Sequence, residues 1–277
     1  MILNGNLVVA VYRGEEVDIE GCSNLAAFMA NQQSDLGSIC LDICQSLAVL
    51  HQRSITIGPE MLQPATILVV ESSVGPRAVL MVDRARAGGS PQEDLRATGL
   101  LLAYVWSIGD RTPSLLEKDL ITTMTEDSSS LTARATLAHL AFWTSARCMK
   151  FLTAVSDILE LKQGRHIAAV ERVAEEVVGS SWLAALHPQL QEKVRRDARR
   201  RRDYSETSLQ DLLRVVRNLA CHYHVLAPEV RAALGPMEEL GRFWGATFPF
   251  LLAKVHGAMA PFSRDTNCSS IRQFYMD

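Results

Sequence analysis

Aromatic residues are scarce in this sequence, at 6% of its 277 residues. A core with so few rings must be built mainly from Leu, Ala, Val and Ile, which favours helices. Long apolar runs are missing as well, because stretches such as 100–106 and 248–253 fall far short of the roughly 18 residues that a membrane span needs. We therefore expect no membrane partner.

The sequence also lacks an excess of charge of one sign. It has 28 basic and 31 acidic residues and a net charge of −3, so overall charge indicates no partner and any nucleic-acid signal must be local. Its six cysteines contain no C-x-x-C motif and no paired zinc spacing. Residues 1–10 lack the basic start and apolar core of a signal peptide, so we expect reduced thiols in a cytoplasmic protein.

The spacing of apolar residues predicts a mainly α fold with a few strands near the start. The expected elements in the first half are a strand at 6–12, a helix at 36–51, strands at 66–70 and 78–82, and a buried helix at 94–107 that Gly109 ends. From residue 131 onward the pattern is helical, and the breaks fall at Gly164, Gly179-Ser180, 202–208, Pro228 and Gly235-Pro236.

The composition shifts once, at residues 193–202, where seven basic side chains accompany the single acid Asp197. Such a run is either a solvated helix face or loop, or a surface that contacts nucleic acid. The arginines that would contact RNA are Arg199, Arg200, Arg201 and Arg202.

Segment 205–226 reads as a helix with one apolar face. An advance of about 100° per residue places Asp211, Asn218 and His222 in one narrow stripe opposite that face. Arg217 flanks this stripe. The exposed side of the helix is therefore expected to carry a carboxylate, an amide, an imidazole and a guanidinium group.

This set of groups suits phosphodiester chemistry. Arginine and asparagine can hold a phosphate and its developing charge, and histidine can exchange a proton near neutral pH. The sequence has no acidic cluster suited to magnesium, which leaves the intramolecular reaction open only to RNA, in which the 2′-hydroxyl attacks the neighbouring phosphorus. The alternative is that these are ordinary polar residues on a solvated helix face.

The residues from Tyr204 to Tyr223 resemble the signature of the kinase-extension nuclease (KEN) family. That family comprises the endoribonuclease arm of the inositol-requiring unfolded-protein-response sensor and the ribonuclease RNase L. The matching motif contains Tyr204, Asp211, Leu212, Leu213, Arg214, Arg217, Asn218, His222 and Tyr223, and the match continues through 226–235 and 243–252. The resemblance implies an all-helical KEN endoribonuclease domain at 144–262, followed by a tail at 263–277.

The same resemblance implies a protein-kinase fold before the nuclease, and residues 1–143 resemble a truncated kinase C-terminal lobe. The similar segments are 47–51, 62–69, 94–109 and 137–143. Residues 57–61 stand where a kinase has His-Arg-Asp, and Gln63 and Thr66 replace the catalytic-loop Lys and Asn. Asp83-Arg84-Ala85 keeps only the first residue of Asp-Phe-Gly. We therefore expect a pseudokinase lobe without kinase activity and without ATP binding.

The resemblance also implies a role for each residue of the motif. Tyr204 would be the general base toward the 2′-hydroxyl, and His222 the general acid at the leaving 5′-oxygen. Arg217 and Asn218 would hold the scissile phosphate, and Asp211 would support them by orienting a neighbour. The products would be a 2′,3′-cyclic phosphate and a 5′-hydroxyl, formed by a homodimer without metal or cofactor.

A free tyrosine has a pKa of about 10, so Tyr204 needs neighbouring cations in order to act near neutral pH. The basic run that precedes it could supply them. Two other residues near the motif have simpler interpretations, since Trp182 is expected in the core and Cys221 as an inert surface thiol. The alternative to an active nuclease is a catalytically silent RNA-binding pseudoenzyme that dimerises with an active relative.

Overall fold

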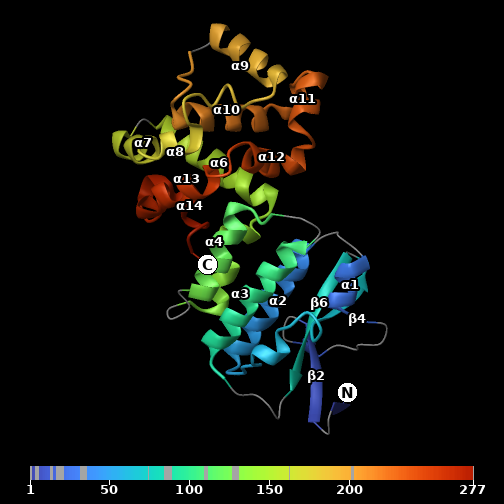
Figure 1. Ribbon diagram of the computed structural model, residues 1–277. Coiled ribbons are helices and arrows are strands. Elements are labelled where there is room, and N and C mark those ends of the chain that lie inside the picture. Colours follow the sequence, from blue (N-terminus) through green and yellow to red (C-terminus); the bar gives the residue numbers. More distant parts are fainter. Residues whose placement is uncertain are drawn as a thin grey trace. The chain divides into compact units, whose positions relative to one another are not determined.

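A computed structural model describes residues 2–3, 6–12, 15–16, 22–31, 36–73, 75–83, 89–108, 112–126, 131–161, 163–200 and 203–276. The chain divides into two compact units, Met1–Phe142 and Trp143–Asp277. Both units are mainly α-helical, as the sequence predicts, and a small antiparallel sheet belongs to the first (Figure 1).

The first unit begins with strands and continues with helices. Its strands are β1 (Ile2–Leu3), β2 (Asn6–Tyr12), β3 (Glu15–Glu16), β4 (Ser23–Asn24), β5 (Leu68–Ser72) and β6 (Gly75–Asp83). Its α-helices are α1 (Leu25–Asn31), α2 (Leu36–Gln52), α3 (Pro91–Trp106), α4 (Leu115–Glu126) and α5 (Ala133–Leu137). The strand at 6–12 and the helix at 36–51 are confirmed, whereas Gly109, the expected stop of α3, lies outside the described residues.

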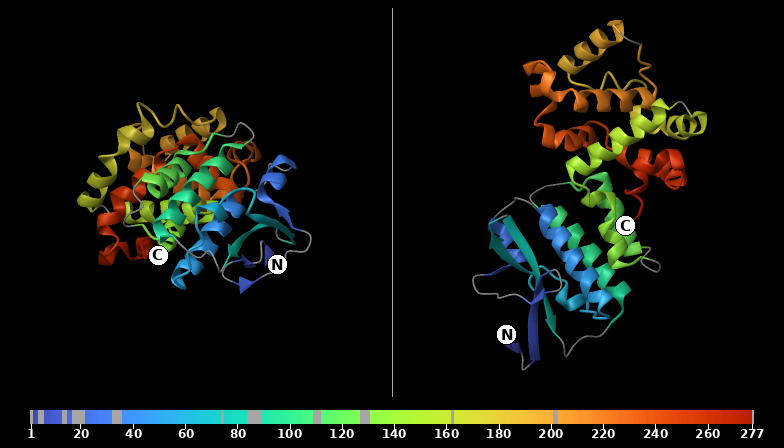
Figure 2. Two further views of the ribbon diagram at one scale, coloured as in Figure 1. Left: turned by 60° about the horizontal axis from the view of Figure 1, so that its bottom comes forward. Right: turned by 180° about the vertical axis from the view of Figure 1, so that it is seen from behind.

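The described strands pair in the order β1-β2-β6-β5-β4, and β3 pairs with β2. Side chains alternate between the two faces of β6. Ala78, Leu80 and Val82 join the main core, and Val79 and Met81 form a smaller cluster. Helix α2 packs on β6 and beside α3, which the two views of Figure 2 show from other sides. Apolar residues of α2 thus close the core over the sheet.

A buried carboxylate organises residues 57–58, in the segment that is expected to correspond to a kinase catalytic loop. Asp94, in the first turn of α3, accepts hydrogen bonds from the backbone N–H groups of Ile57 (3.0 Å) and Gly58 (2.8 Å). Nε2 of His51, at the end of α2, lies 2.9 Å from the same carboxylate. These bonds hold the backbone of residues 57–58 against the start of α3. Without them, the two buried N–H groups would have no hydrogen-bond partner.

The described residues of the second unit form helices joined by turns and loops, without a strand. Its α-helices are α6 (Ser145–Glu160), α7 (Gly164–Glu171), α8 (Ala174–Val178), α9 (Pro188–Arg200), α10 (Leu209–Cys221), α11 (Pro228–Leu234), α12 (Leu240–Thr247), α13 (Leu251–Met259) and α14 (Ser269–Arg272). Several predicted breaks are confirmed, since α7 starts at Gly164, α8 ends before Gly179, and α11 starts at Pro228 and ends before Gly235. Gly179 and Gly235 have φ values of +57° and +76°, which glycine adopts without strain.

Helix α6 is the centre of this unit and packs against α10 and α12. The crossing with α12 is very close, because a Cβ atom added to Gly241 would lie 2.4 Å from the carbonyl oxygen of Ser145. The backbone N–H of Gly241 also donates to Oγ of Ser145 at 2.8 Å. Any side chain at position 241 would therefore force the two helices apart.

Residues 263–276, which the sequence sets apart as a tail, pack into the second unit. The short 3-10 turn Thr266–Cys268 leads directly into α14, and α14 contacts α6. Cys268, Ile271 and Phe274 are buried. The Phe274 ring lies 5.3 Å, centroid to centroid, from that of Phe151 in α6. This segment thus contributes to the core of the unit.

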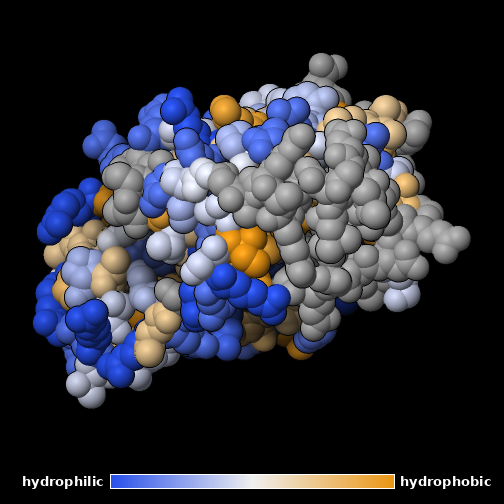
Figure 3. Space-filling model, turned by 90° about the horizontal axis from the view of Figure 1, so that it is seen from below, coloured by the Kyte–Doolittle hydropathy of each residue, from blue (hydrophilic) through white to orange (hydrophobic). Residues whose placement is uncertain are grey.

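Among the described residues, no helix is both long and apolar enough to span a membrane. Large apolar side chains that are exposed occur at scattered positions, such as Leu100, Leu161 and Val225. The coloured residues in Figure 3 show a mostly hydrophilic face on which hydrophobic areas are small and separate. Such isolated apolar residues are ordinary on a protein surface.

Candidate active site

Helix α10 carries Asp211, Arg217 and Asn218 of the predicted site, and side chains from its own cap and from α7 fix its start. Ser208 is the N-cap residue, and its Oγ accepts from the backbone N–H of Asp211 at 3.1 Å. The carboxylate of Glu171 accepts from Ser208 Oγ (2.7 Å), Leu209 N–H (3.3 Å) and Gln210 N–H (2.8 Å). A negative group at this end also interacts favourably with the helix dipole.

Asp211 is buried, so its predicted place on a solvent-exposed stripe is wrong. Its Oδ1 accepts from Nη1 of Arg214 at 2.6 Å, and its Oδ2 accepts from the backbone N–H of Ser205 at 2.9 Å. Arg214 is buried as well and donates from Nε to Glu160 of α6 at 2.5 Å. The helix itself has the predicted period. The charged side chains of Asp211 and Arg214 nevertheless point inward, because partners from other segments, Ser205 and Glu160, satisfy them there.

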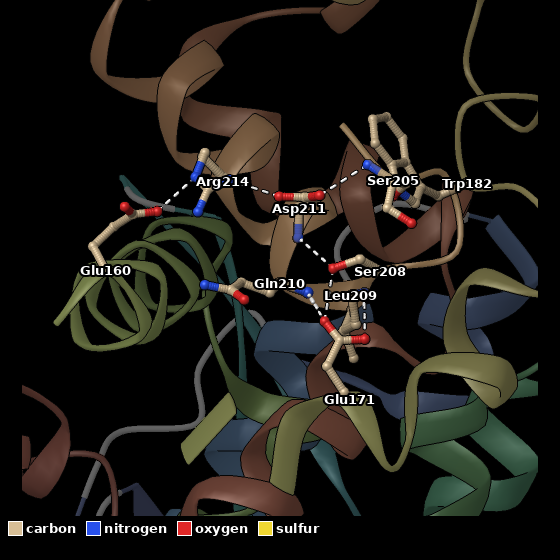
Figure 4. Close-up of polar contacts among 9 residues, drawn as sticks. All are labelled: Glu160, Glu171, Trp182, Ser205, Ser208, Leu209, Gln210, Asp211 and Arg214. Atoms are coloured by element: carbon tan, nitrogen blue, oxygen red, sulfur yellow. Dashed lines mark hydrogen bonds and ion pairs between the residues drawn. The ribbon is translucent and has the colours of Figure 1, made fainter. Parts of the chain in front are cut away.

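The segment before α10 is held so that Tyr204 has a defined position. Besides the Asp211 bond, Nε1 of the buried Trp182 donates to the Ser205 carbonyl at 3.0 Å, and the Trp182 N–H donates to the Glu206 carbonyl at 3.0 Å. Figure 4 shows Trp182 beside Ser205, and the contacts of Asp211, Ser208 and Glu171 at the start of α10. Trp182 is a core residue, as expected, and its ring centroid lies 6.2 Å from that of Tyr204.

Three predicted catalytic residues line one cavity of about 320 Å³, which we call the Tyr204 cavity. It lies between α9, the segment before α10, and the C-terminal half of α10. Its lining residues are Lys193, Val194, Asp197, Tyr204, Val215, Asn218, Leu219, His222, Val225 and Leu226. Helix α10 ends at Cys221, earlier than predicted, so His222 is its exposed C-cap residue. The cavity thus has a phenol, an amide and an imidazole on its wall.

The surroundings of Tyr204 do not favour its ionised form. Burial, the largest influence, raises the pKa of Tyr204, and the negative charge of Asp197 acts in the same direction. A hydrogen bond with the Asn218 side chain and the positive charge of Arg214 lower the pKa, but the net shift is upward. The described surroundings therefore favour a neutral phenol. The basic run that is expected to lower this pKa lies partly outside the described residues.

Arg217 lies next to the Tyr204 cavity but does not line it. Its Nε is 2.5 Å from Oδ1 of Asp157 in α6, and its Nη1 donates to the Asn218 side-chain oxygen at 3.3 Å. Arg217 therefore links α6 to a residue of the cavity wall.

The basic run forms the second half of α9. Lys193 forms an ion pair with Asp197, and both line the Tyr204 cavity, whereas Arg196 and Arg199 lie 3.7 Å and 3.5 Å from Glu192. Arg199 is strongly exposed, at 70% of its side chain. Arg201 and Arg202 lie outside the described residues, and the side chain of Arg200 is not described. The described part of the run is thus a solvated helix face beside the cavity.

Sequence reasoning missed the partners that build the site from a distance. Glu171 caps α10 from 37–39 residues away, and Glu160 holds Arg214 from 54 residues away. No local pattern marks either residue as part of the site. The sequence does contain a signal for two other residues of the cavity wall, Lys193 and Asp197, because their i,i+4 spacing places them on one helix face.

Comparison with known proteins shows the family of the second unit. Residues 148–273 match the profile of the family described as Ribonuclease 2-5A. This part of the chain therefore belongs to that family, the kinase-extension nucleases. The match begins in α6 and ends after α14, so it includes all the elements around the Tyr204 cavity.

Each of three similar proteins matches this chain over only a small part of its own length. The serine/threonine-protein kinase/endoribonuclease IRE2 of Homo sapiens is 37% identical over 126 residues, which cover 44% of this chain and 13% of that protein. The kinase/endoribonuclease ire-1 of Caenorhabditis elegans is 34% identical over 158 residues, 55% of this chain and 15% of that protein.

The third relative is the sensor for unfolded proteins in the ER, ire1, of Schizosaccharomyces pombe. It is 30% identical over 158 residues, which cover 54% of this chain and 14% of that protein. The chain therefore matches 13–15% of the length of these three relatives.

Proposed function

We propose that the second unit is an endoribonuclease that cleaves single-stranded or stem-loop RNA. The observation that carries this proposal is the Tyr204 cavity, which brings Tyr204, Asn218 and His222 onto one wall inside a ribonuclease-family domain. The relatives named above as endoribonucleases support the same class of activity.

In the proposed reaction the 2′-hydroxyl of RNA attacks the adjacent phosphorus and the 5′-oxygen leaves. His222, which is exposed at the end of α10 and lines the cavity, gives a proton to the leaving oxygen in this proposal. Tyr204 takes the proton of the 2′-hydroxyl in its phenolate form, so the neutral phenol of the resting site first releases its own proton to solvent, and its hydrogen bond with Asn218 orients the ring. The products are a 2′,3′-cyclic phosphate and a 5′-hydroxyl.

Charge stabilisation on the phosphate is assigned to Asn218 and Arg217. Arg217 already contacts the Asn218 oxygen, so a small rotation of its guanidinium would present donors to a phosphate held at the cavity wall. In the absence of a phosphate, Arg217 is paired with Asp157. Asp211 takes the supporting role, because it holds the backbone next to Tyr204.

The proposed reaction does not use a metal ion. Asp197 is the one carboxylate among the residues that line the Tyr204 cavity, and it is paired with Lys193. A two-metal mechanism needs several oxygen ligands held together around the phosphate. The donor set of the cavity instead suits acid–base catalysis by side chains.

We further propose that the first unit is a scaffold without kinase activity or ATP binding. Thr66, which stands where a kinase has a metal-binding Asn, donates its hydroxyl to the carbonyls of Met61 (3.0 Å) and Gln63 (2.9 Å). Asp83 ends β6, and Arg84 and Ala85 after it lie outside the described residues. The hydroxyl of Thr66 is thus used to close its own loop.

Assembly and location are also part of the proposal. The family resemblance supports a homodimer, and the exposed arginines of α9, including Arg199, support contact with the RNA backbone. Cys44, Cys148, Cys221 and Cys268 are free thiols, which fits a reducing, cytoplasmic location. The ire1 relative is named as a sensor of unfolded proteins, so we place the activity of this chain in RNA processing linked to such stress.

The test is cleavage of a short RNA stem-loop in EDTA at rising protein concentration. We expect cleavage that leaves 2′,3′-cyclic phosphate ends and increases more than proportionally with concentration, as a dimer requires. His222→Ala should lower the rate by about 10²- to 10⁴-fold, the usual contribution of a general acid. Tyr204→Phe should lower it by a similar factor.

A matched control distinguishes loss of catalysis from loss of fold. His224 is exposed two residues after His222, so His224→Ala should leave the rate unchanged. Circular dichroism should show the same helix content for all variants. Wild-type rates in the folded His222→Ala protein would refute the proposed role of His222.

A second candidate function is a silent RNA-binding protein that regulates an active relative. The neutral phenol of Tyr204 and the commitment of Arg217 to Asp157 favour it, since neither residue is in a reactive state. In that case the wild-type chain alone binds RNA without cleaving it at any concentration. Adding it to an active family member would then change the rate of that partner.

A further inference from the structure

Three potential metal ligands converge at a point in the second unit that shares no residue with the Tyr204 cavity. Nε2 of His166, in α7, lies 3.7 Å from Sγ of Cys268 and 3.6 Å from Oδ2 of Asp265. All three ligand atoms lie within 4.8 Å of one another. We propose that these three side chains bind one divalent transition-metal ion, with Zn²⁺ as the natural occupant.

The distances fit a tetrahedral site. Zinc binds sulfur at about 2.3 Å, and nitrogen and carboxylate oxygen at about 2.0–2.2 Å. Ligands on such bonds are separated by roughly 3.4–3.6 Å in a tetrahedron, which follows from these bond lengths. The nitrogen–sulfur and nitrogen–oxygen distances here are 3.7 Å and 3.6 Å, and the sulfur and the oxygen lie within 4.8 Å of each other, so Nε2 of His166 is already at ligand spacing from both other atoms.

The local fold explains why two of the ligands face the same way. Asp265 and Cys268 are three residues apart across a 3-10 turn, in which residues i and i+3 lie above each other. The backbone N–H of Cys268 donates to the Asp265 carbonyl at 3.0 Å and closes this turn. The Phe262 ring packs edge-to-face on the His166 imidazole, at 4.7 Å between centroids, and fixes its plane. The turn thus positions Asp265 and Cys268, and the Phe262 ring positions His166.

A catalytic Cys-His-Asp relay is the obvious alternative, and the geometry argues against it. In a relay the carboxylate contacts one imidazole nitrogen and the nucleophile the other. Here the thiol and the carboxylate both approach Nε2, while the buried Nδ1 has no hydrogen-bond partner in the described structure. A proton on Nδ1 leaves the lone pair of Nε2 facing the thiol and the carboxylate, which is how a ligating histidine is arranged.

The identity of the ion follows from the donors. One thiolate, one imidazole and one carboxylate form a borderline-soft set that suits Zn²⁺ better than Mg²⁺ or Ca²⁺, which prefer oxygen ligands. His166 and Cys268 are buried, and Asp265 is 29% exposed, so an ion enters from the Asp265 side. A water molecule would complete four-fold coordination there.

Arg165 competes with a metal ion for Asp265 and therefore lowers the metal affinity of the site. Its Nη2 lies 2.8 Å from Oδ2 of Asp265, and 60% of its side chain is exposed. A cation at the site would repel this guanidinium, which has room to move into solvent. The guanidinium is thus a removable competitor for the same carboxylate oxygen.

The test measures metal binding by the purified full chain, with Zn²⁺ and Co²⁺ as probes. After incubation with zinc and removal of free metal, we expect about one ion bound per chain at this site. Co²⁺ should give a thiolate-to-cobalt charge-transfer band in the near ultraviolet. Zn²⁺ should raise the thermal midpoint of the second unit, because a ligand that binds only the folded state stabilises it.

Variants assign the signal to the proposed ligands. Cys268→Ser, which is close to isosteric, should abolish the charge-transfer band, whereas Cys221→Ser removes an exposed thiol and should retain it. Asp265→Asn should weaken zinc binding by at least about 10-fold. Arg165→Gln should strengthen it, an effect that a merely structural role for Arg165 does not produce.

The proposal is overturned if wild-type and folded Cys268→Ser proteins bind the same amount of metal. It is equally overturned if the cobalt–thiolate band survives in Cys268→Ser. Because none of these readouts uses RNA cleavage, the outcome is independent of the proposed nuclease activity.

Discussion

Tyr204 carries a phenol whose pKa is raised, because burial outweighs the hydrogen bond with Asn218 and the positive charge of Arg214. In the unfolded chain the same phenol titrates at about 10. The neutral phenol therefore stabilises the folded state fully at pH values below about 10. This stabilisation is lost as the pH rises through the higher pKa of the folded protein.

This difference predicts an alkaline loss of stability that depends on Tyr204. We expect the free energy of unfolding of the wild type to fall above about pH 10, and to fall less steeply in Tyr204→Phe. Urea unfolding at a series of pH values measures both slopes. Tyr104 is exposed in the first unit, so Tyr104→Phe serves as the control and should follow the wild type. Identical slopes in Tyr204→Phe and wild type would contradict the burial argument.

At the scale of elements, the N-terminus of α10 depends on one carboxylate from α7. Glu171 accepts hydrogen bonds from Ser208, Leu209 and Gln210. Glu171→Ala removes all three and should destabilise the second unit by about 2 kcal/mol, the range expected for a lost helix cap with charged hydrogen bonds.

Chemical denaturation followed by circular dichroism measures this loss. The exposed Glu238 is the matched control, and Glu238→Ala should change the free energy of unfolding by less than about 0.5 kcal/mol. Since Tyr204 is held through Ser205 and α10, Glu171→Ala should also slow RNA cleavage if the proposed function holds. An equal effect of both substitutions on stability would show that Glu171 does not act as a cap.

Much of the element pattern was predictable because it depends on local spacing. The apolar repeat of 36–51 identified α2, and Gly164 marked the start of α7. Gly179 and Gly235 marked helix ends because, without a Cβ atom, they adopt positive φ values freely. The strand at 66–70 was placed two residues early, since Thr66 closes a turn with its hydroxyl and only Leu68 begins β5.

The orientation of charged residues was not predictable in the same way. Asp211 and Arg214 point inward because Glu160, Ser205 and each other satisfy their charges. His166 and Cys268 meet across 102 residues. Such contacts depend on which helices pack together, and a single helical period contains no information about the partner helix.

For the molecule as a whole, two compact units predict two unfolding transitions. Asp94→Asn replaces a buried carboxylate that holds His51, Ile57 and Gly58, and should lower the stability of the first unit by about 2 kcal/mol or more. Glu171→Ala should lower the transition of the second unit only. Differential scanning calorimetry of both variants separates the two effects.

A single shared transition, shifted equally by Asp94→Asn and Glu171→Ala, would contradict this prediction. Two independent transitions would show that the described cores carry their own stability. The RNA-cleavage assay could then be repeated with Asp94→Asn, to measure how far the nuclease depends on the folded state of the first unit.

The close crossing of α6 and α12 limits how the sequence can drift over evolutionary time. Because even a methyl group at position 241 would lie 2.4 Å from the Ser145 carbonyl oxygen, an alanine there is incompatible with this spacing of the two helices. Descendants of this chain that keep the crossing therefore keep glycine at that position. A lineage that loses this glycine must also repack α6. Helix α6 carries Asp157 and Glu160, which contact Arg217 and Arg214 of α10, so such repacking would reach the residues beside the Tyr204 cavity.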